Sequence, residues 1–286
     1  MQITRKSFLS QTGDHQKVDG ASKLLEWNSP LLDSEGPGNI LIALHGHWME
    51  AATFLPLVDC LPSGWRLIAL DQRGHGDSDH AASYRRSDYL ADIEALFAHP
   101  SIESAVLLGH SLGGVNAYQF AAKHPEQTQA LIIEDIGPTV SDDASFVRSW
   151  AGTFKDKSEL EKRIGPRLLP YVQQSFRQTD EGWRLAFDPI DEDQSQRQLN
   201  GVHWRDWLAS TCKALVIRGE NSPITKETEI REMVERRGNS SLVTLPRGHV
   251  VHADNLHGFC RALNAFLASM ENGELRPAVC TEAAIS

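Results

Sequence analysis

The chain has few basic residues and no long apolar run, and each shortage excludes a class of protein. Its 286 residues include 28 lysines and arginines against 38 aspartates and glutamates, which gives a formal net charge of −10. Nucleic acid and anionic membrane surfaces both require a basic face, so we expect neither as a partner. No run approaches the ~20 apolar residues that a transmembrane helix needs, so no membrane span is expected.

Cysteine is scarce as well. The four cysteines, Cys60, Cys212, Cys260 and Cys280, show no close paired spacing. This spacing indicates neither a disulfide framework nor a zinc site, and we interpret the first three, which stand in apolar stretches, as small core residues. The first residues lead into polar sequence without an apolar segment of signal-peptide length. We therefore expect a cytoplasmic protein.

Short apolar runs alternate with helical patterns along most of the chain. The runs are mostly Val, Ile and Leu, as expected of strands that are covered on both faces of a parallel sheet. They lie at residues 40–44, 66–70, 105–108, 130–133, 214–217 and 242–245. Helix candidates lie near residues 54–60, 87–97, 112–123, 226–237 and 255–270. The alternation predicts an α/β fold with a mostly parallel, doubly wound sheet.

Residues 138–208 interrupt this alternation with polar helical segments and many aromatic residues. We interpret them as an inserted cap of mainly helical character, so that residues 1–137 and 209–271 form the core. Most of the aromatic side chains are expected to pack between cap and core, and one or two to line a pocket. Residues 272–286 are interpreted as a loose C-terminal tail.

The stretch Gly109-His110-Ser111-Leu112-Gly113 joins an apolar run directly to a helical pattern. Strand, G-x-S-x-G and helix in this order are the context of a nucleophile elbow. The serine of an elbow has a cramped backbone conformation, so the residues two before and two after it must be small. Ser111 is therefore the candidate nucleophile. The alternative is a glycine-rich turn that only links strand to helix.

The run at 40–44 ends in His45-Gly46-His47-Trp48. In elbow hydrolases a loop after this early strand supplies one main-chain N–H of the oxyanion hole. We expect His47 to donate through its main chain and Leu112, which follows the nucleophile, to supply the second N–H. Each donor would stabilise the charge that the tetrahedral intermediate concentrates on one oxygen.

Gly248-His249 follows the last apolar run and precedes the final helix. The general base comes last in chain order in this architecture, which makes His249 the candidate base. His252 is a rival for the role. His257 falls inside the helical pattern and is expected on its solvated face.

The acid is the unusual member of the set. The loop after residues 214–217, where such enzymes commonly place an aspartate, has Ser222 and Pro223 at the relevant positions, and its carboxylate Glu220 stands too early. The run at 130–133 leads instead into Glu134-Asp135. Side chains alternate along a strand, so only one of these two can reach the histidine. We choose Asp135, beyond the strand end, to hold the tautomer of His249; the alternative is an aspartate that caps or braces the hinge of the cap.

The segment at residues 71–78 reads DQRGHGDS and follows another apolar run. Its glycines suit a tight turn, and Asp71 and Arg73 can hold neighbouring loops by charge-assisted hydrogen bonds. A phosphate-binding loop is excluded because the glycine spacing is not G-x-G-x-x-G and no Gly-Lys-Ser or Gly-Lys-Thr occurs. We expect a structural role.

Together these segments resemble the α/β-hydrolase superfamily over residues 38–270. Residues 135–138, 182–184 and 219–223 further resemble a small bacterial esterase branch. The resemblance implies hydrolysis of short acyl esters and acyl-CoA thioesters, and an acid at the end of the sixth strand, which favours Asp135 over Glu220. A related branch with the same acid placement cleaves amides of small dicarboxylic acid derivatives. Ser111 stands where the dehalogenase and epoxide-hydrolase branches carry a nucleophilic aspartate, and Trp48 replaces the proline of their His-Gly-x-Pro loop.

The expected function is a serine hydrolase that cleaves a small carboxylic ester or thioester through an acyl-enzyme, with Ser111, His249 and Asp135 as its triad. This chemistry needs no metal and no organic cofactor. An amidohydrolase is an alternative from the same superfamily. A metallohydrolase built on His45 and His47 would need further ligands, and no third or fourth ligand cluster accompanies the pair. A non-catalytic receptor of this fold would have no need for serine, histidine and acid together.

Arginines of the cap could meet a substrate carboxylate or a CoA phosphate. Such residues are more often solvated surface charges, so we assign them no binding role. They are Arg148, Arg163, Arg167 and Arg177. The sequence indicates neither the acyl length of the substrate nor an oligomeric state.

Overall fold

The computed structural model describes residues 3–18, 21–99 and 102–271. The tail expected at residues 272–286, with Cys280, lies outside the described residues. Among the described residues, eight strands form a single large sheet in the order β1-β2-β4-β3-β5-β6-β11-β12. The strands are β1 (Thr4–Val18), β2 (Ala21–Asp33), β3 (Asn39–Leu44), β4 (Trp65–Leu70), β5 (Ala105–His110), β6 (Thr128–Glu134), β11 (Lys213–Gly219) and β12 (Ser240–Leu245).

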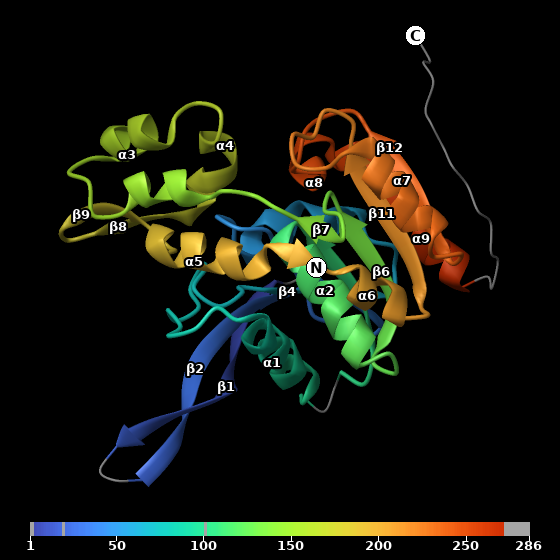
Figure 1. Cartoon of the computed structure of the whole chain (residues 1–286), viewed down its shortest axis with the longest axis horizontal. Coiled ribbons are helices and arrows are strands. Elements are labelled where there is room, and N and C mark those ends of the chain that lie inside the picture. The colour runs from blue at the N-terminus through green and yellow to red at the C-terminus, as the bar shows by residue number, and fades with distance from the viewer. Residues whose placement is uncertain (1–2, 19–20, 100–101, 272–286) are drawn as a thin grey trace.

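The six strands from β4 to β12 in this order are parallel, whereas β1 and β2 are antiparallel to their neighbours. Each of the six predicted apolar runs lies within one parallel strand. Helices pack on both faces, so the predicted α/β fold with a doubly wound, mostly parallel sheet is confirmed (Figure 1).

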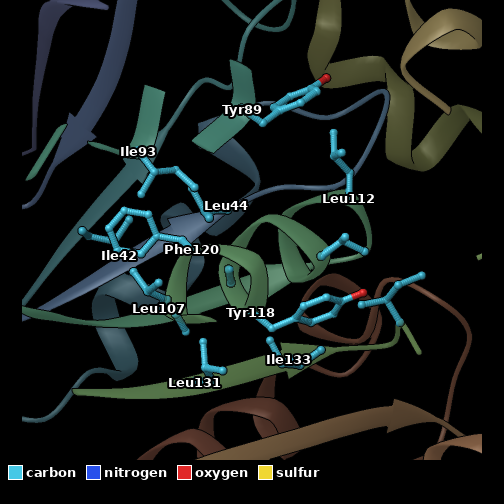
Figure 2. Close-up of a cluster of buried hydrophobic side chains, with 14 of the residues drawn as sticks. Ile42, Leu44, Tyr89, Ile93, Leu107, Leu112, Tyr118, Phe120, Leu131 and Ile133 are labelled. Atoms are coloured by element: carbon cyan, nitrogen blue, oxygen red, sulfur yellow. The ribbon is translucent and has the colours of Figure 1, made fainter. Parts of the chain in front are cut away.

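Alternating side chains of these strands enter two apolar clusters, one on each face of the sheet. In β3, Ile42 and Leu44 join the first cluster, and Leu41 and Ala43 join the second. Figure 2 shows the first cluster, in which side chains from the sheet meet those of the covering helices. This face is covered by α1 (Arg86–Phe97), α2 (Leu112–Lys123), α6 (Trp204–Ala209) and α7 (Glu227–Glu235). The opposite face is covered by η1 (Ala51–Cys60), α8 (Val251–Asp254) and α9 (Leu256–Glu271).

Two local differences from the sequence interpretation have physical causes. The helix expected near residues 54–60 is the 3₁₀ helix η1, which contains Pro56. Proline lacks the N–H and its ring clashes with the preceding turn of an α-helix. The hairpin of β1 and β2 was not predicted, because the sequence TRKSFLSQTGDHQKV of β1 has no continuous apolar run. Only Leu31–Asp33 of this hairpin pairs with β4, and Figure 1 shows the rest extending beyond the sheet.

The segment at residues 138–208 contains helices, as expected, and also two small antiparallel sheets that the sequence did not indicate. One sheet pairs β7 (Thr139–Val140) with β10 (Gly201–Val202), and the other pairs β8 (Phe176–Thr179) with β9 (Gly182–Leu185). The helices are η2 (Ser145–Trp150), α3 (Lys157–Ile164), α4 (Leu169–Val172), η3 (Gln173–Ser175), α5 (Pro189–Leu199) and the start of α6. A separate apolar cluster, which includes Trp150, Phe154 and Phe187, holds this segment together.

The interpretation of Cys60 and Cys260 as unlinked core residues is wrong. The two form a disulfide across a sequence separation of 200 residues. Cys60 ends η1 and Cys260 lies in α9, and both helices cover the same face of the sheet, which brings distant parts of the chain together. Cys212 is half-buried with a free thiol. Disulfides persist mainly in oxidising compartments; the cytoplasmic location expected from the sequence stays a prediction. None of the helices in the described ranges is long and apolar enough to cross a membrane.

Candidate active site

Ser111 stands at the junction of β5 and α2 in a strained backbone conformation, with φ 50° and ψ −116°. Such a conformation is unusual for a residue with a side chain and requires surrounding structure to maintain it. A Cβ atom at Gly109 would lie 2.2 Å from the Gly113 carbonyl oxygen, and one at Gly113 would lie 2.0 Å from the Leu44 carbonyl oxygen. The elbow therefore has the close approaches that require both glycines, and it leaves Ser111 half-buried at the carboxyl edge of the sheet.

The loop after β3 lies directly against this elbow. The Gly113 N–H donates to the His45 carbonyl oxygen at 3.1 Å. A Cβ atom at Gly46 would lie only 3.1 Å from the Cβ of Ser111. Within the described ranges, the main-chain N–H groups of His47 and Leu112 have no protein acceptor. They are thus free to donate to a substrate oxygen, as an oxyanion hole requires.

Asp135 follows β6 and meets the imidazole of His249, with 2.7 Å between Oδ2 and Nδ1. The carboxylate is fully buried. Its Oδ1 atom accepts the Gly219 N–H and the Thr225 hydroxyl, each at 2.9 Å, and Ser222 Oγ donates to Oδ2. Four donors from the β11 loop and the histidine therefore hold the carboxylate in one orientation. A carboxylate held in this way fixes the imidazole tautomer with the proton on Nδ1.

His110 connects this imidazole to the elbow. Its Nε2–H donates to the His249 carbonyl oxygen at 3.1 Å, and the centroids of the two rings lie 4.6 Å apart. Because His110 directly precedes Ser111, the imidazole of His249 is beside the elbow. The His249 side chain is 23% exposed, so a substrate can reach it. The structure thus brings Ser111, Asp135 and His249, which come from three separate connections, to one edge of the sheet.

The rival residues lie elsewhere. Glu134 points away from His249 and pairs with the rival His252, with 2.7 Å between Oε2 and Nδ1. Both side chains are buried, and His252 Nε2 lies 2.8 Å from Thr53 Oγ1. Burial alone would raise the pKa of the Glu134 carboxyl, but the charges of His252 and His110 hold it below its usual value. Glu220 and His257 are both exposed.

Comparison with known proteins agrees with this geometry. The model of the alpha/beta hydrolase family matches residues 41–262. The chain belongs to this family. A 2-(acetamidomethylene)succinate hydrolase of Mesorhizobium japonicum is 27% identical over 226 residues, which cover 74% of this chain and 81% of that protein. The sn-1-specific diacylglycerol lipase ABHD11 of Mus musculus is 24% identical over 281 residues, which cover 91% and 90%.

Solved structures show the same fold. The crystal structure of E-2-(acetamidomethylene)succinate hydrolase superposes with a TM-score of 0.76 at 22% identity, covering 93% of this chain and all of that one. A thioesterase domain from the curacin biosynthetic pathway superposes with a TM-score of 0.67 at 19% identity, covering 91% and 99%. Both likenesses are below 25% identity and show the fold of this α/β hydrolase.

The segment at residues 71–78 has the structural role expected of it in this α/β hydrolase. Asp71 Oδ1 accepts the Ala51 N–H at 2.7 Å, which ties the segment to the start of η1. Arg73 is fully buried and pairs with Asp92 at 2.8 Å. Within residues 3–18, 21–99 and 102–271, no group of three His, Cys, Asp or Glu side chains could hold a metal ion.

Aromatic side chains from two separate segments meet next to the loop that follows β3. Trp48 of that loop contacts Phe146 and Trp150 of η2, with ring centroids 5.7 and 5.6 Å apart. Trp150 is buried, whereas Phe146 is 49% exposed. Aromatic pairs in edge-to-face geometry supply large apolar contact areas.

Proposed function

We propose that this α/β hydrolase is a serine hydrolase that cleaves a carboxylic ester or thioester of a small acyl substrate through an acyl-enzyme. The observation that carries the proposal is the Asp135–His249 contact beside a serine in a strained elbow. Ser111 is the nucleophile, His249 the general base and Asp135 the residue that orients the base. A nucleophile, a base in reach and a third group that orients the base form the arrangement of covalent catalysis.

In the first half of the reaction Ser111 Oγ attacks the carbonyl carbon, and His249 Nε2 takes the hydroxyl proton. The oxygen of the tetrahedral intermediate accepts the N–H groups of His47 and Leu112. Collapse breaks the bond to the alcohol or thiol, which leaves with the proton from His249. In the second half a water molecule attacks the acyl-enzyme in the same way, and the acid and free Ser111 result.

Two cap arginines argue against a dicarboxylic amide as the substrate. Arg148 pairs with Asp193 at 2.6 Å, and Arg177 pairs with Glu50 at 2.7 Å. Both guanidinium groups already have a carboxylate partner within the protein, which leaves them less available to a substrate carboxylate. The aromatic contacts of Trp48 support an uncharged acyl or alcohol group.

The proposal is tested with a panel of p-nitrophenyl acetate and butyrate, acyl-CoA thioesters and N-acyl amides, assayed with the wild type and with Ser111→Ala. We expect hydrolysis of the esters and a loss of roughly 10⁴–10⁶ in kcat on Ser111→Ala. Ser269→Ala is the matched control, because Ser269 lies in α9, where its carbonyl accepts from Lys213 at the start of β11, the strand end opposite the site. Full ester hydrolysis by Ser111→Ala would overturn the proposal. Hydrolysis of the amides alone would keep the mechanism and replace the substrate class.

A further inference from the structure

Helix α5 of the cap places two buried side chains against the loop that carries the expected oxyanion donor. Ser195 Oγ lies 2.9 Å from Nε2 of His47 and 2.8 Å from the Tyr89 hydroxyl. Glu192 Oε2 accepts the N–H of Trp48 at 3.2 Å. Glu192 and Ser195 are 1% and 0% exposed. The cap thus contacts the ring of His47 and the main-chain N–H of Trp48, the two residues joined by the peptide between positions 47 and 48.

The second oxygen of Glu192 forms a buried ion pair with the core. Its Oε1 lies 2.8 Å from Nε2 of His75, and the two side chains are 1% and 0% exposed. His75 Nδ1 lies 2.9 Å from the Arg73 carbonyl oxygen. A carbonyl oxygen only accepts, so Nδ1 carries a proton. Nε2 lies at ion-pair distance from the carboxylate, although neither atom makes a hydrogen bond within the described residues. The buried negative charge of Glu192 favours a charged imidazole at His75, which would offset it.

The neighbouring groups agree with this charge assignment. Burial lowers the pKa of His47 to about 4, and burial also holds the pKa of His45 well below its usual value. Burial would lower the pKa of His75 as well, but the Glu192 carboxylate raises it above its usual value, with a smaller contribution from Asp71. Of the three histidines in this cluster, His75 is thus the one whose surroundings favour the charged ring. Arg86 and Tyr89 also face the cluster, Arg86 through its charge on His47 and Tyr89 through its interaction with Glu192.

The position of a carboxylate here matters for catalysis. An unpaired negative charge next to the Trp48 N–H would repel the negative oxygen that develops in the oxyanion hole, and the repulsion is strong where water is excluded. The same carboxylate accepts the Trp48 N–H and so holds the peptide that follows His47, the expected oxyanion donor. When its charge is neutralised, the Glu192 carboxylate therefore orients the loop without repelling the oxyanion of the reaction.

We propose that Glu192 and His75 act together as positioning residues of the oxyanion hole: Glu192 of the cap fixes the Trp48 peptide, and His75 of the core neutralises the carboxylate. The proposal rests on the serine hydrolase function proposed above. Ser195 fixes the His47 ring from the same helix.

The test compares His75→Gln, Glu192→Gln and the double variant by steady-state hydrolysis of p-nitrophenyl butyrate. Gln at 192 keeps an oxygen for the Trp48 N–H and has no charge. We expect His75→Gln to lower kcat about 10- to 100-fold with little change in KM, because its Glu192 is left uncompensated. Glu192→Gln should lose less than about fivefold. The double variant should recover to the level of Glu192→Gln.

A trifluoromethyl ketone inhibitor provides a second readout, because its adduct with a serine carries an oxyanion. Its inhibition constant should weaken in His75→Gln in proportion to kcat/KM. Tyr84→Phe is the matched control, because the Tyr84 hydroxyl donates to Asp191 of the same cap helix at 2.8 Å and not to the loop after β3. This variant should keep wild-type kcat.

A double variant as impaired as His75→Gln, or a kcat of His75→Gln within twofold of the wild type, would overturn the positioning proposal. If His75→Gln does not fold, the double variant decides, since its uncharged pair should fold and keep activity. Wild-type activity and its loss in Ser111→Ala test the hydrolase function separately. An active wild type with unaffected positioning variants therefore refutes only the present proposal.

Discussion

Replacement of Asp135 by asparagine changes one oxygen of the carboxylate to NH₂ and should move the imidazole proton of His249 from Nδ1 to Nε2. Oδ1 of Asp135 accepts from the Gly219 N–H and Thr225, and Oδ2 faces His249 Nδ1. The single oxygen of asparagine satisfies the first two donors, so its NH₂ group faces the imidazole. Two N–H groups cannot donate to each other, so Nδ1 loses its proton. Nε2 then carries the proton toward Ser111 and cannot act as the base.

The expected loss follows from the tautomer. The corresponding aspartate-to-asparagine change in a serine protease leaves the geometry intact and lowers kcat about 10⁴-fold. The same loss here corresponds to about 5.4 kcal/mol of transition-state stabilisation. Binding of the substrate does not involve the tautomer, so KM should change little. Asp135→Asn should also lose about 1 to 3 kcal/mol of unfolding free energy, because weaker neutral hydrogen bonds replace the two charge-assisted ones at Oδ2.

The assay is steady-state hydrolysis of p-nitrophenyl butyrate at pH 7, with denaturant unfolding of the same samples. Glu220→Gln is the matched control, because Glu220 is an exposed carboxylate directly after β11 and was the alternative acid in the sequence. It should keep activity within about twofold of the wild type. The reasoning is refuted if folded Asp135→Asn retains more than a tenth of the wild-type kcat, or if Glu220→Gln is the variant that loses activity.

Three further predictions concern stability. Burial would raise the pKa of Asp33, but hydrogen bonds from Arg66 and Lys6 outweigh it and lower this pKa to about 2. A stabilisation of about 1 to 2 kcal/mol that is complete above pH 4 should therefore be lost as the pH falls to 2. Acid titration of the wild type against Asp33→Asn measures this loss, and identical pH profiles of the two proteins would contradict it. Cys260→Ser should lower the unfolding free energy by about 2 to 4 kcal/mol because the bond to Cys60 closes a loop of 200 residues, and equal stability under reducing and oxidising conditions would count against the disulfide. Gly109→Ala should lower the free energy of unfolding by about 1 to 3 kcal/mol and abolish most activity, since its Cβ would lie 2.2 Å from a main-chain oxygen. The control Gly238→Ala has nothing within 4 Å of its Cβ and should leave the melting temperature and turnover unchanged. A similar effect of both substitutions would refute the steric argument.

The parallel sheet was predictable because buried strands read as continuous apolar runs. β5, for example, shows as Ala-Val-Leu-Leu directly before the elbow. The hairpin of β1 and β2 was missed because a ribbon outside the layered core has no need of such runs. The strands β8 and β9, with four residues each, are too short to show a period.

The candidate site was predictable where its geometry is local. A strained serine between small residues, and a histidine after the last strand, leave a signal within a few positions. The sequence also indicated that Glu134 and Asp135 serve different partners, since neighbouring side chains diverge.

Contacts between segments that are distant in the sequence left no local pattern from which they could be predicted. The disulfide of Cys60 joins residues 200 positions apart. The pair of Glu192 with His75 joins a cap helix to a core turn. His75 was interpreted only as a member of a glycine-rich turn, and nothing near Glu192 in the sequence indicates its partner. The packing of η1 and α9 on the same face of the sheet defines the disulfide, and the packing of the cap on the core defines the pair of Glu192 with His75.

The central claim is that Ser111 becomes covalently acylated. A fluorophosphonate probe that reacts with activated serines, followed by intact-mass and peptide mass spectrometry, measures this directly. The wild type should carry one probe mass on the peptide that contains Ser111, and Ser111→Ala should carry none. A preparation that hydrolyses p-nitrophenyl butyrate while Ser111 stays unmodified and its activity persists would contradict the account.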